Sequence, residues 1–179
     1  GEGGQPFEAL AGWVQTFLQI LDCKTPLKMI SMQDASKVIE CDVTEDELEF
    51  KQWPFWKTKK WAQHVMGRLF TRLGNVKLAK EEHKDLAKFF KAHFVESLVN
   101  INIKTLADSS LGKNIETRVP DRIVNLALQF LVSAVHVAAA YKAMKPVMPD
   151  LITKVCFPLL CYDNSDDELW RDDPKEFVR

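Results

Sequence analysis

The segment from Pro120 to about Tyr141 is apolar on almost every side, and this feature constrains the fold more than any other. Apolar residues occupy most of its positions, including the run Ala138-Ala139-Ala140. The length and the opening proline predict a helix, since proline needs no N–H in the first turn. A helix that is apolar all round has to be covered on most sides by other elements. No segment shows a convincing strand pattern, so these neighbours are predicted to be helices.

Other segments show the spacing of amphipathic helices, with apolar residues three and four positions apart. These predicted helices span 6–21, 54–73, 80–104 and 146–162. Gly74 and Asn75 predict a left-handed C-cap after the second of them. Residues 99–103 also alternate like a strand, which leaves the end of the third helix open. Pro158 lies inside the last helix and predicts a bend or an early end, because an internal proline costs ~3 kcal/mol.

The predicted helices are joined by connections of different lengths. Residues 23–52 break the helical pattern, so a long connection is expected there, which a short helix could interrupt. The residues between Tyr141 and Pro146 predict a tight connection, and residues 108–118 predict a polar loop. Residues 1–5, which open with Gly-Glu-Gly-Gly, are interpreted as an added remnant or a linker and are left out of the fold.

Successive long antiparallel helices form either a bundle or a stack of helix hairpins. Consensus HEAT-type repeats are ~40–47 residues long. The equivalent helix starts at Pro54 and Pro120 lie further apart than this, because the intervening loops are long. The spacing therefore permits a solenoid without proving one.

Charge and cysteine usage exclude several classes of protein. The formal net charge of −1 predicts no attraction of the whole chain to nucleic acid or to membranes. No apolar run is long enough to span a bilayer. The four cysteines lack CxxC spacing, which favours a reducing compartment, cytosol or nucleus, and no disulfide framework.

The sequence contains no pattern that carries catalysis, metal binding or cofactor binding. Each histidine lies in a helical stretch, and none follows a glutamate three residues earlier. Phosphate-binding glycine loops and nucleophile elbows are also missing. His136, on the most apolar helix, is either an unusual buried ligand or, more simply, a core or edge histidine with a backbone partner. We therefore expect no enzyme, no cofactor and no metal site.

Lysines and tryptophans gather around the start of the helix over 54–73. The cluster consists of Lys57, Lys59, Lys60, Trp53, Trp56 and Trp61. A nucleic-acid patch uses such residues, but it would need partners elsewhere in the chain. A solvated helix face over a tryptophan core explains the cluster more simply. No direct binding of nucleic acid is expected.

The C-terminal stretch from Asp163 to Arg179 carries seven acidic and three basic side chains, for a net charge of −4. A solubilising loop with a helix N-cap near Asp166 is one interpretation. A surface that attracts a basic partner is the other, and the large aromatic Trp170 among the acids favours it. The candidate binding residues are Asp163, Asp166, Asp167, Glu168, Trp170, Asp172, Asp173 and Glu176.

Three segments together resemble a known family. They are WPFWKTKKWAQHVMGRLFTRLGN (53–75), the helix pair over 119–162 that ends in CFPLLCY, and DDELWRDDPKEFVR (166–179). In this order and spacing they resemble the importin-beta superfamily, and within it the importin-7/importin-8 class of nuclear import receptors. The last motif is the most specific, and the likeness is weak over residues 25–50.

The resemblance implies an all-α fold, a right-handed solenoid of HEAT-type antiparallel helix pairs with about two to three repeats. Residues 6–179 would be an internal segment of a longer solenoid, and residues 163–179 an acidic connection that begins the next repeat. By the same likeness, 54–73 and 120–141 would be outer helices, while 6–21 and 80–104 would line the concave surface.

The resemblance also implies a function. The chain would be a segment of a nuclear transport receptor that binds cargo, Ran-GTP and nucleoporins and shuttles between cytoplasm and nucleus. Basic cargo such as ribosomal proteins or histones would suit the acidic stretch, and Ran-GTP would bind mainly to repeats outside this chain. Phenylalanines of FG nucleoporins would insert between the outer helices. The alternative is a HEAT-type structural scaffold in another protein assembly, not linked to Ran.

Overall fold

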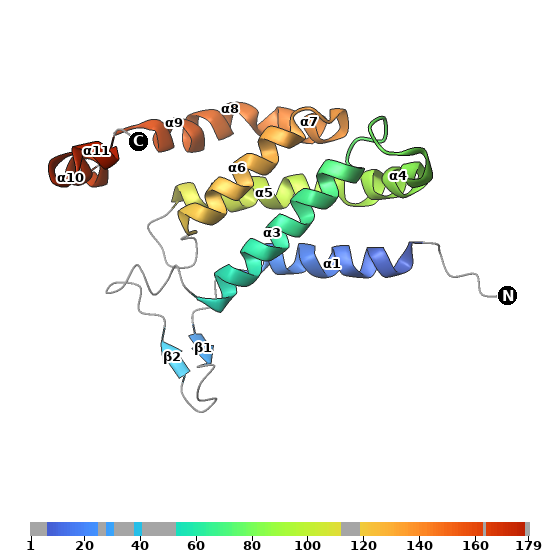
Figure 1. Cartoon of the computed structure of the whole chain (residues 1–179), viewed down its shortest axis with the longest axis horizontal. Coiled ribbons are helices and arrows are strands. Elements are labelled where there is room, and N and C mark those ends of the chain that lie inside the picture. The colour runs from blue at the N-terminus through green and yellow to red at the C-terminus, as the bar shows by residue number, and fades with distance from the viewer. Residues whose placement is uncertain are drawn as a thin grey trace.

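The computed structural model describes residues 7–24, 28–30, 38–40, 53–111, 119–162 and 164–177. Within these ranges the chain is almost entirely helical (Figure 1). The longer helices are α1 (Glu8–Asp22), α3 (Pro54–Leu73), α4 (Lys84–His93), α5 (Val95–Leu111), α6 (Asp121–Ala134), α7 (Ala138–Met144) and α10 (Asn164–Asp172). The shorter turns of helix are η1 (Glu81–His83), η2 (Lys145–Val147), α8 (Met148–Leu151), η3 (Ile152–Cys156), α9 (Phe157–Leu160) and α11 (Pro174–Phe177).

The helices form two layers (Figure 1). Helices α3 and α6 lie side by side in one layer, and α1, α5 and the run from α7 to α9 form the other. Helix α5 packs against α1, α6 and α7, so it contacts helices that come before it and after it in the chain. This arrangement is HEAT-like and confirms the predicted all-α fold of antiparallel helix pairs.

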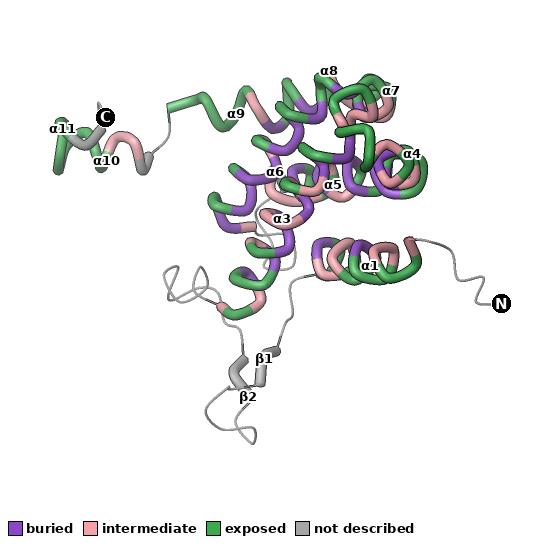
Figure 2. The backbone as a smooth tube through the Cα atoms, turned by 45° about the vertical axis from the view of Figure 1, so that its right-hand side comes forward, coloured by how far each residue is buried: buried purple, intermediate pink, exposed green. Residues whose placement is uncertain are grey.

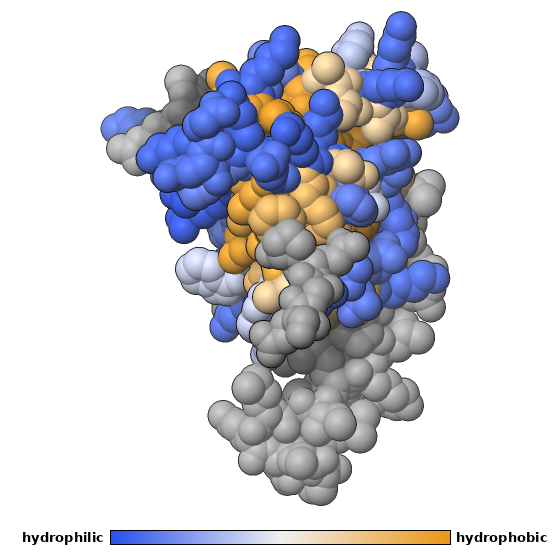
Figure 3. All heavy atoms as spheres, turned by 90° about the vertical axis from the view of Figure 1, so that its right-hand side faces the viewer, coloured by the Kyte–Doolittle hydropathy of each residue, from blue (hydrophilic) through white to orange (hydrophobic). Residues whose placement is uncertain are grey.

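One continuous apolar core joins these helices, and the buried residues face inward from both layers (Figure 2). Phe70 of α3 meets Phe130 of α6 edge to face, with 4.8 Å between ring centroids. Phe7 lies 5.3 Å from the ring of Phe89, which joins the start of α1 to α4. At the end of the molecule that faces the viewer in Figure 3, hydrophobic residues gather in a band between hydrophilic side chains.

Helix α5 is covered on most sides and carries a buried polar residue. Leu98, Val99 and Leu106 are completely buried, as is Asn102. The Asn102 amide donates to the carbonyl of Leu98 and accepts a hydrogen bond from Gln63 of α3. Since buried polar groups need partners, this contact fixes how α3 crosses α5. The strand considered for residues 99–103 is excluded, because they lie inside α5.

Helix α3 has the predicted bounds, but its end differs from the prediction. Gly74 has φ −66° and ψ −30°, so the left-handed C-cap is wrong. A Cβ atom on Gly74 would lie 2.6 Å from the carbonyl oxygen of Phe70 and 3.0 Å from its ring. Glycine is therefore required here by the close approach of Phe70 and not by a positive φ.

The helix predicted over 80–104 is interrupted and extends further. It begins with η1, breaks at Phe94 and continues as α5 to Leu111, into the segment expected as a loop. Phe94 takes a φ of −125°, and its ring lies 5.8 Å from those of Phe89 and Phe90. The packing of these aromatic rings accompanies the break, which helix periodicity alone does not reveal.

The boundary predicted between the last two long helices is wrong. The chain reverses at residues 135–137, and residues 138–160 follow as one helical run that changes type several times. Val135 and Val137 are β-branched, which lowers helix propensity at the reversal. Pro146, Pro149 and Pro158 lack an N–H, so the run passes through the 3₁₀ turn η2 and the π turn η3. It ends two residues after Pro158, as the early-end prediction stated.

Two strands lie within the connection over 23–52, where a short helix was considered. β1 (Lys28–Ile30) and β2 (Val38–Glu40) pair antiparallel, with Met29 opposite Ile39. The acidic run from Thr44 to Glu49 lies outside the described residues, as do residues 112–118 of the predicted loop.

Candidate protein-binding surfaces

The acidic stretch predicted as a binding site forms α10 and α11. In Figures 1 and 2 these helices lie beyond the end of α9, apart from the two packed layers. Asp163 lies outside the described residues, as does the side chain of Glu176. The predicted N-cap at Asp166 is wrong, because α10 already begins at Asn164 and Asp166 stands in its first turn. Acidic groups in a first turn are favoured by the helix dipole.

Two of these carboxylates have partners within or next to the acidic stretch. Asp167 accepts a hydrogen bond from the Tyr162 hydroxyl at 3.2 Å and forms an ion pair with Arg171 one turn later. Desolvation and then the charge of Asp167 raise the pKa of Tyr162. Asp173 accepts the backbone N–H of Lys175 at 3.1 Å, at the start of α11. Asp167 and Asp173 therefore have structural roles.

Other residues of α10 face solvent. Glu168 and Asp172, four positions apart, are exposed, and neither forms an ion pair within the described part of the chain. Trp170 is 48% exposed and Leu169 39%. The acidic stretch thus offers exposed carboxylates beside an accessible aromatic ring, and aromatic residues are enriched in protein interfaces.

An apolar surface lies next to these acidic helices. The amphipathic helix predicted over 146–162 implies that Ile152, Leu159 and Leu160 face the core, but all three are exposed, Leu160 by 84%. The π turn η3 adds a residue to one turn, which rotates Leu159 and Leu160 after it, and no described helix covers the face that they occupy. A groove of about 640 Å³ runs between α6 and the turns η3 and α9, with Leu128 and Val155 among its lining residues.

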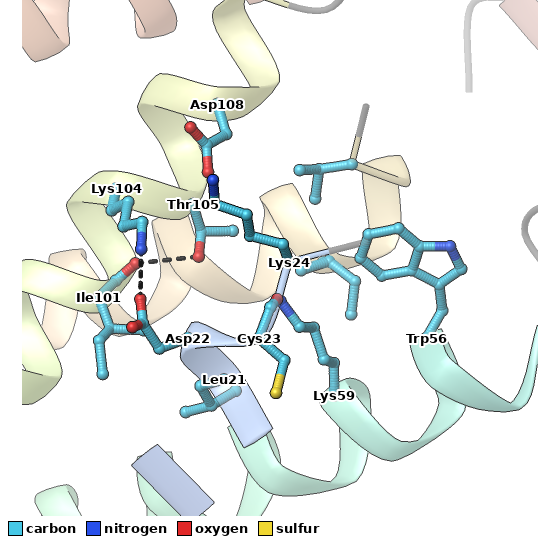
Figure 4. A pocket seen from close by; sticks show the side chains of 12 residues that line it. Leu21, Asp22, Cys23, Lys24, Trp56, Lys59, Ile101, Lys104, Thr105 and Asp108 are labelled. Carbon is cyan, nitrogen blue, oxygen red and sulfur yellow. Dashed lines mark hydrogen bonds and ion pairs between the residues drawn. The ribbon is translucent and has the colours of Figure 1, made fainter. Parts of the chain in front are cut away.

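A second cavity, of about 240 Å³, lies where α1 ends against α3 and α5. Figure 4 shows Lys59 extending from α3 toward Cys23, with Trp56 nearby. The Lys59 ammonium donates to the carbonyl of Cys23 and lies 5.0 Å from the ring centroid of Phe55. Lys104 of α5 forms an ion pair with Asp22 at 2.5 Å. The cavity is thus crossed by charged groups that already have partners.

Lys59 is a buried lysine that sequence reasoning placed on a solvated face. It is 9% exposed, and this burial lowers its pKa to about 8, against the opposing charges of Asp22 and Asp108. Trp61, which was predicted to belong to a tryptophan core, is 64% exposed. Position 59 lies on the same helical face as Met66 and Phe70, so the periodicity of α3 could have identified it.

A third hollow lies between α3 and α6, the two helices between which the resemblance placed nucleoporin phenylalanines. It measures about 280 Å³, and its floor contains Leu126 and Phe130. Its edges are polar: Arg68 and Arg72 stand on the α3 side, and Gln129 on the α6 side. Sequence reasoning did not recognise this basic rim, because it depends on which face of α3 turns outward.

The described residues contain no group of three or more side chains suited to a metal ion. His136 is exposed, which excludes the buried-ligand interpretation. Cys23, Cys156 and Cys161 are free thiols, and Cys41 lies outside the described ranges. Among the described helices, none has the length and apolar character that crossing a bilayer requires.

Comparison with family models identifies the fold family. The model of the Cse1 family matches residues 75–179, which include α4 to α11. The chain belongs to the Cse1 family. This family is importin-beta-like, so the predicted membership in the importin-beta superfamily is confirmed. Its importin-beta-like homologues support a nuclear transport receptor family.

Curated proteins agree with this assignment. The Cse1-family chain is similar to the importin beta-like SAD2 homolog of Arabidopsis thaliana, with 32% identity over 93% of the chain and 15% of that protein. Importin-8 of Mus musculus is 28% identical over 96% of the chain and 15% of its own length. A probable importin-7 homolog of Dictyostelium discoideum is 26% identical, with the same coverage. The chain thus spans about 15% of these relatives. No solved structure matches it significantly.

Proposed function

We propose that this chain is a segment of a nuclear transport receptor and that α10 and α11 form a binding surface for basic protein cargo. The observation that supports this most directly is the position of the acidic helices, clear of the packed layers, with Glu168 and Asp172 exposed. Carboxylates in such a position accelerate encounters with a basic partner. The exposed Trp170 and Leu160 supply apolar contacts that slow dissociation.

The proposal for the whole receptor goes beyond this segment. The receptor binds cargo such as ribosomal proteins or histones, binds Ran-GTP mainly through repeats outside this chain, contacts FG nucleoporins and shuttles between cytoplasm and nucleus. Membership in the Cse1 family supports it. Its test is the affinity of the full-length receptor for Ran loaded with GTP and with GDP. A strong GTP preference is expected, whereas equal or absent binding would leave a HEAT-type scaffold with no link to Ran.

The cargo surface makes a specific prediction. Glu168→Gln combined with Asp172→Asn is expected to slow association with a lysine-rich peptide about threefold at low salt, because long-range attraction is weakened. The salt dependence of the association rate should flatten as well, since fewer charges are left to screen. Stopped-flow fluorescence at several salt concentrations measures both quantities. Asp167 and Asp173 are left unchanged because they have structural roles.

The matched control removes two carboxylates at the opposite end of the molecule. Glu82→Gln with Glu96→Gln changes the net charge equally, and both side chains are exposed. This control should change the association rate less, because η1 and the start of α5 lie at the other end of the molecule from the acidic helices (Figure 1), and salt screens exposed charges that are far apart. An equal effect of the two double variants would show that net charge alone sets the association rate. This result would refute the proposed cargo surface.

A further inference from the structure

The outward face of α3 carries an unbroken basic stripe. Lys57, Lys60, His64, Arg68 and Arg72 follow one another at three- and four-residue spacing, which places them on one side of a helix. The buried side chains of α3 lie on the opposite side, and α3 contains no acidic residue. In the chain as described, the lysines and arginines of the stripe form no ion pair with a carboxylate, whereas Lys84, Lys88 and Lys154 on other helices do.

The stripe borders the hollow between α3 and α6, whose composition is suited to a ligand with both charged and apolar parts. His64, Arg68 and Arg72 line its α3 side, and Gln129 lines the α6 side. Phe130 lies at its floor, where a ligand's apolar group would contact it. None of the described lining residues is acidic. Arginine favours carboxylates, because its planar guanidinium donates two parallel hydrogen bonds to them.

Gly67 gives this hollow its depth on the α3 side. It lies between His64 and Arg68 in the lining, and a Cβ atom built on it meets no atom within 4 Å. The backbone of α3 is therefore reachable at this point. A side chain introduced here would project into the hollow without displacing any neighbour, so the site can be blocked or recharged while the fold is kept.

We infer that the hollow between α3 and α6 binds an acidic peptide segment of a partner protein, with carboxylates on Arg68 and Arg72 and an apolar side chain over Phe130. We infer an acidic ligand from charge complementarity, since the stripe is cationic and its lysines and arginines form no ion pair with a carboxylate among the described residues. A nucleic acid would meet the cations but make no use of the apolar floor. Along this stripe, Trp61 is the one exposed aromatic ring that the described residues offer for stacking.

This inference is separate from the cargo surface proposed on α10 and α11. The two surfaces lie on different helices and have opposite charge, so they select opposite ligands. A basic peptide reports on the acidic helices, and an acidic peptide reports on the hollow. Failure of one proposal is therefore distinguishable from failure of the other.

The test uses the full chain and a fluorescent peptide of glutamates around a single leucine, titrated by anisotropy. Gly67→Glu is expected to weaken binding at least about tenfold, because like charges are brought together. Gly67→Lys, a side chain of similar length, should bind the peptide as well as or better than the parent chain. Both variants should fold, since glycine inside a helix costs ~1 kcal/mol relative to most residues. A lysine-rich peptide should bind all three proteins equally.

Three outcomes would overturn the inference. The first is equal affinity of the parent chain and Gly67→Glu for the acidic peptide. The absence of binding to both proteins counts as the same outcome. The second is equal weakening by Gly67→Glu and Gly67→Lys, which would indicate steric blocking without charge recognition. The third is displacement of the peptide by a single-stranded oligonucleotide at a lower concentration than unlabelled peptide, which would identify a nucleic-acid surface instead.

Discussion

Phe70→Ala is expected to lower the free energy of unfolding by about 3–5 kcal/mol, the largest effect of any single change considered for this chain. Phe70 is almost fully buried in α3, and its ring meets that of Phe130 in α6 at 4.8 Å. Removing the ring leaves a cavity in the layer that these two helices form, in addition to the lost transfer free energy. Urea denaturation followed by circular dichroism measures the change.

The same helix provides the control for this prediction. Trp61→Ala also replaces an aromatic ring with alanine, but Trp61 is 64% exposed on the opposite face of α3. Its ring contacts His64 and lies 5.7 Å from the Lys60 ammonium, contacts of small net value at the surface. The expected loss is within about 0.5 kcal/mol. Similar losses in the two variants would contradict the position of the core.

Lys59→Met is expected to raise the free energy of unfolding at pH 7 by about 1–3 kcal/mol, because a buried charge is replaced by an apolar side chain of similar length. Burial lowers the pKa of Lys59 from 10.5 to about 8. Between these two values the unfolded chain binds more protons than the folded chain. The free energy of unfolding of the parent chain should therefore rise across this interval, by at most about 3 kcal/mol from this group.

The measurement compares the two proteins at pH 7 and at pH 10, so that titrations common to both cancel. The advantage of Lys59→Met should shrink as the pH rises, because the parent lysine becomes neutral. Lys104→Met is the control, since that ammonium is exposed and paired with Asp22, which raises its pKa. An advantage of Lys59→Met that stays constant with pH would show that the lysine is not buried as a charge.

The spacing of apolar residues and the residues that begin or end helices predicted those parts of the fold where the two signals agree. Helix α3 has its predicted bounds because Pro54 begins it, Gly74 follows it and the apolar spacing between them is regular. Helix α1 was also predicted, apart from residues at its ends. The all-α class follows from the apolar character of residues 120–141, which demands cover on most sides.

Prediction failed where tertiary packing or local geometry decides the structure. The break at Phe94 accompanies contacts among aromatic rings, and the reversal at residues 135–137 has no proline or glycine to mark it. Proline positions were visible in the sequence, yet their effect in 138–160 was a change of helix type rather than a new start at Pro146.

The candidate sites were predictable to different degrees. The acidic stretch is evident from composition, but its helical form and the structural roles of Asp167 and Asp173 depend on contacts within it. The helical periodicity of α3 could have predicted that Lys59 is buried. The hollow beside Arg68 and Arg72 was not, because it exists only where α3 and α6, far apart in the sequence, come together.

Helix α5, which touches α1 on one side and α6 and α7 on the other, sets how the segment holds together as a whole. A stack of helix pairs behaves as a one-dimensional lattice, in which each unit is coupled to its nearest neighbours alone. In such a lattice, cooperativity resides in the couplings between units and not in the units themselves. With the Phe70–Phe130 contact, α5 couples α1 and α3 to α6 and α7. Weakening it would divide one melting transition into two.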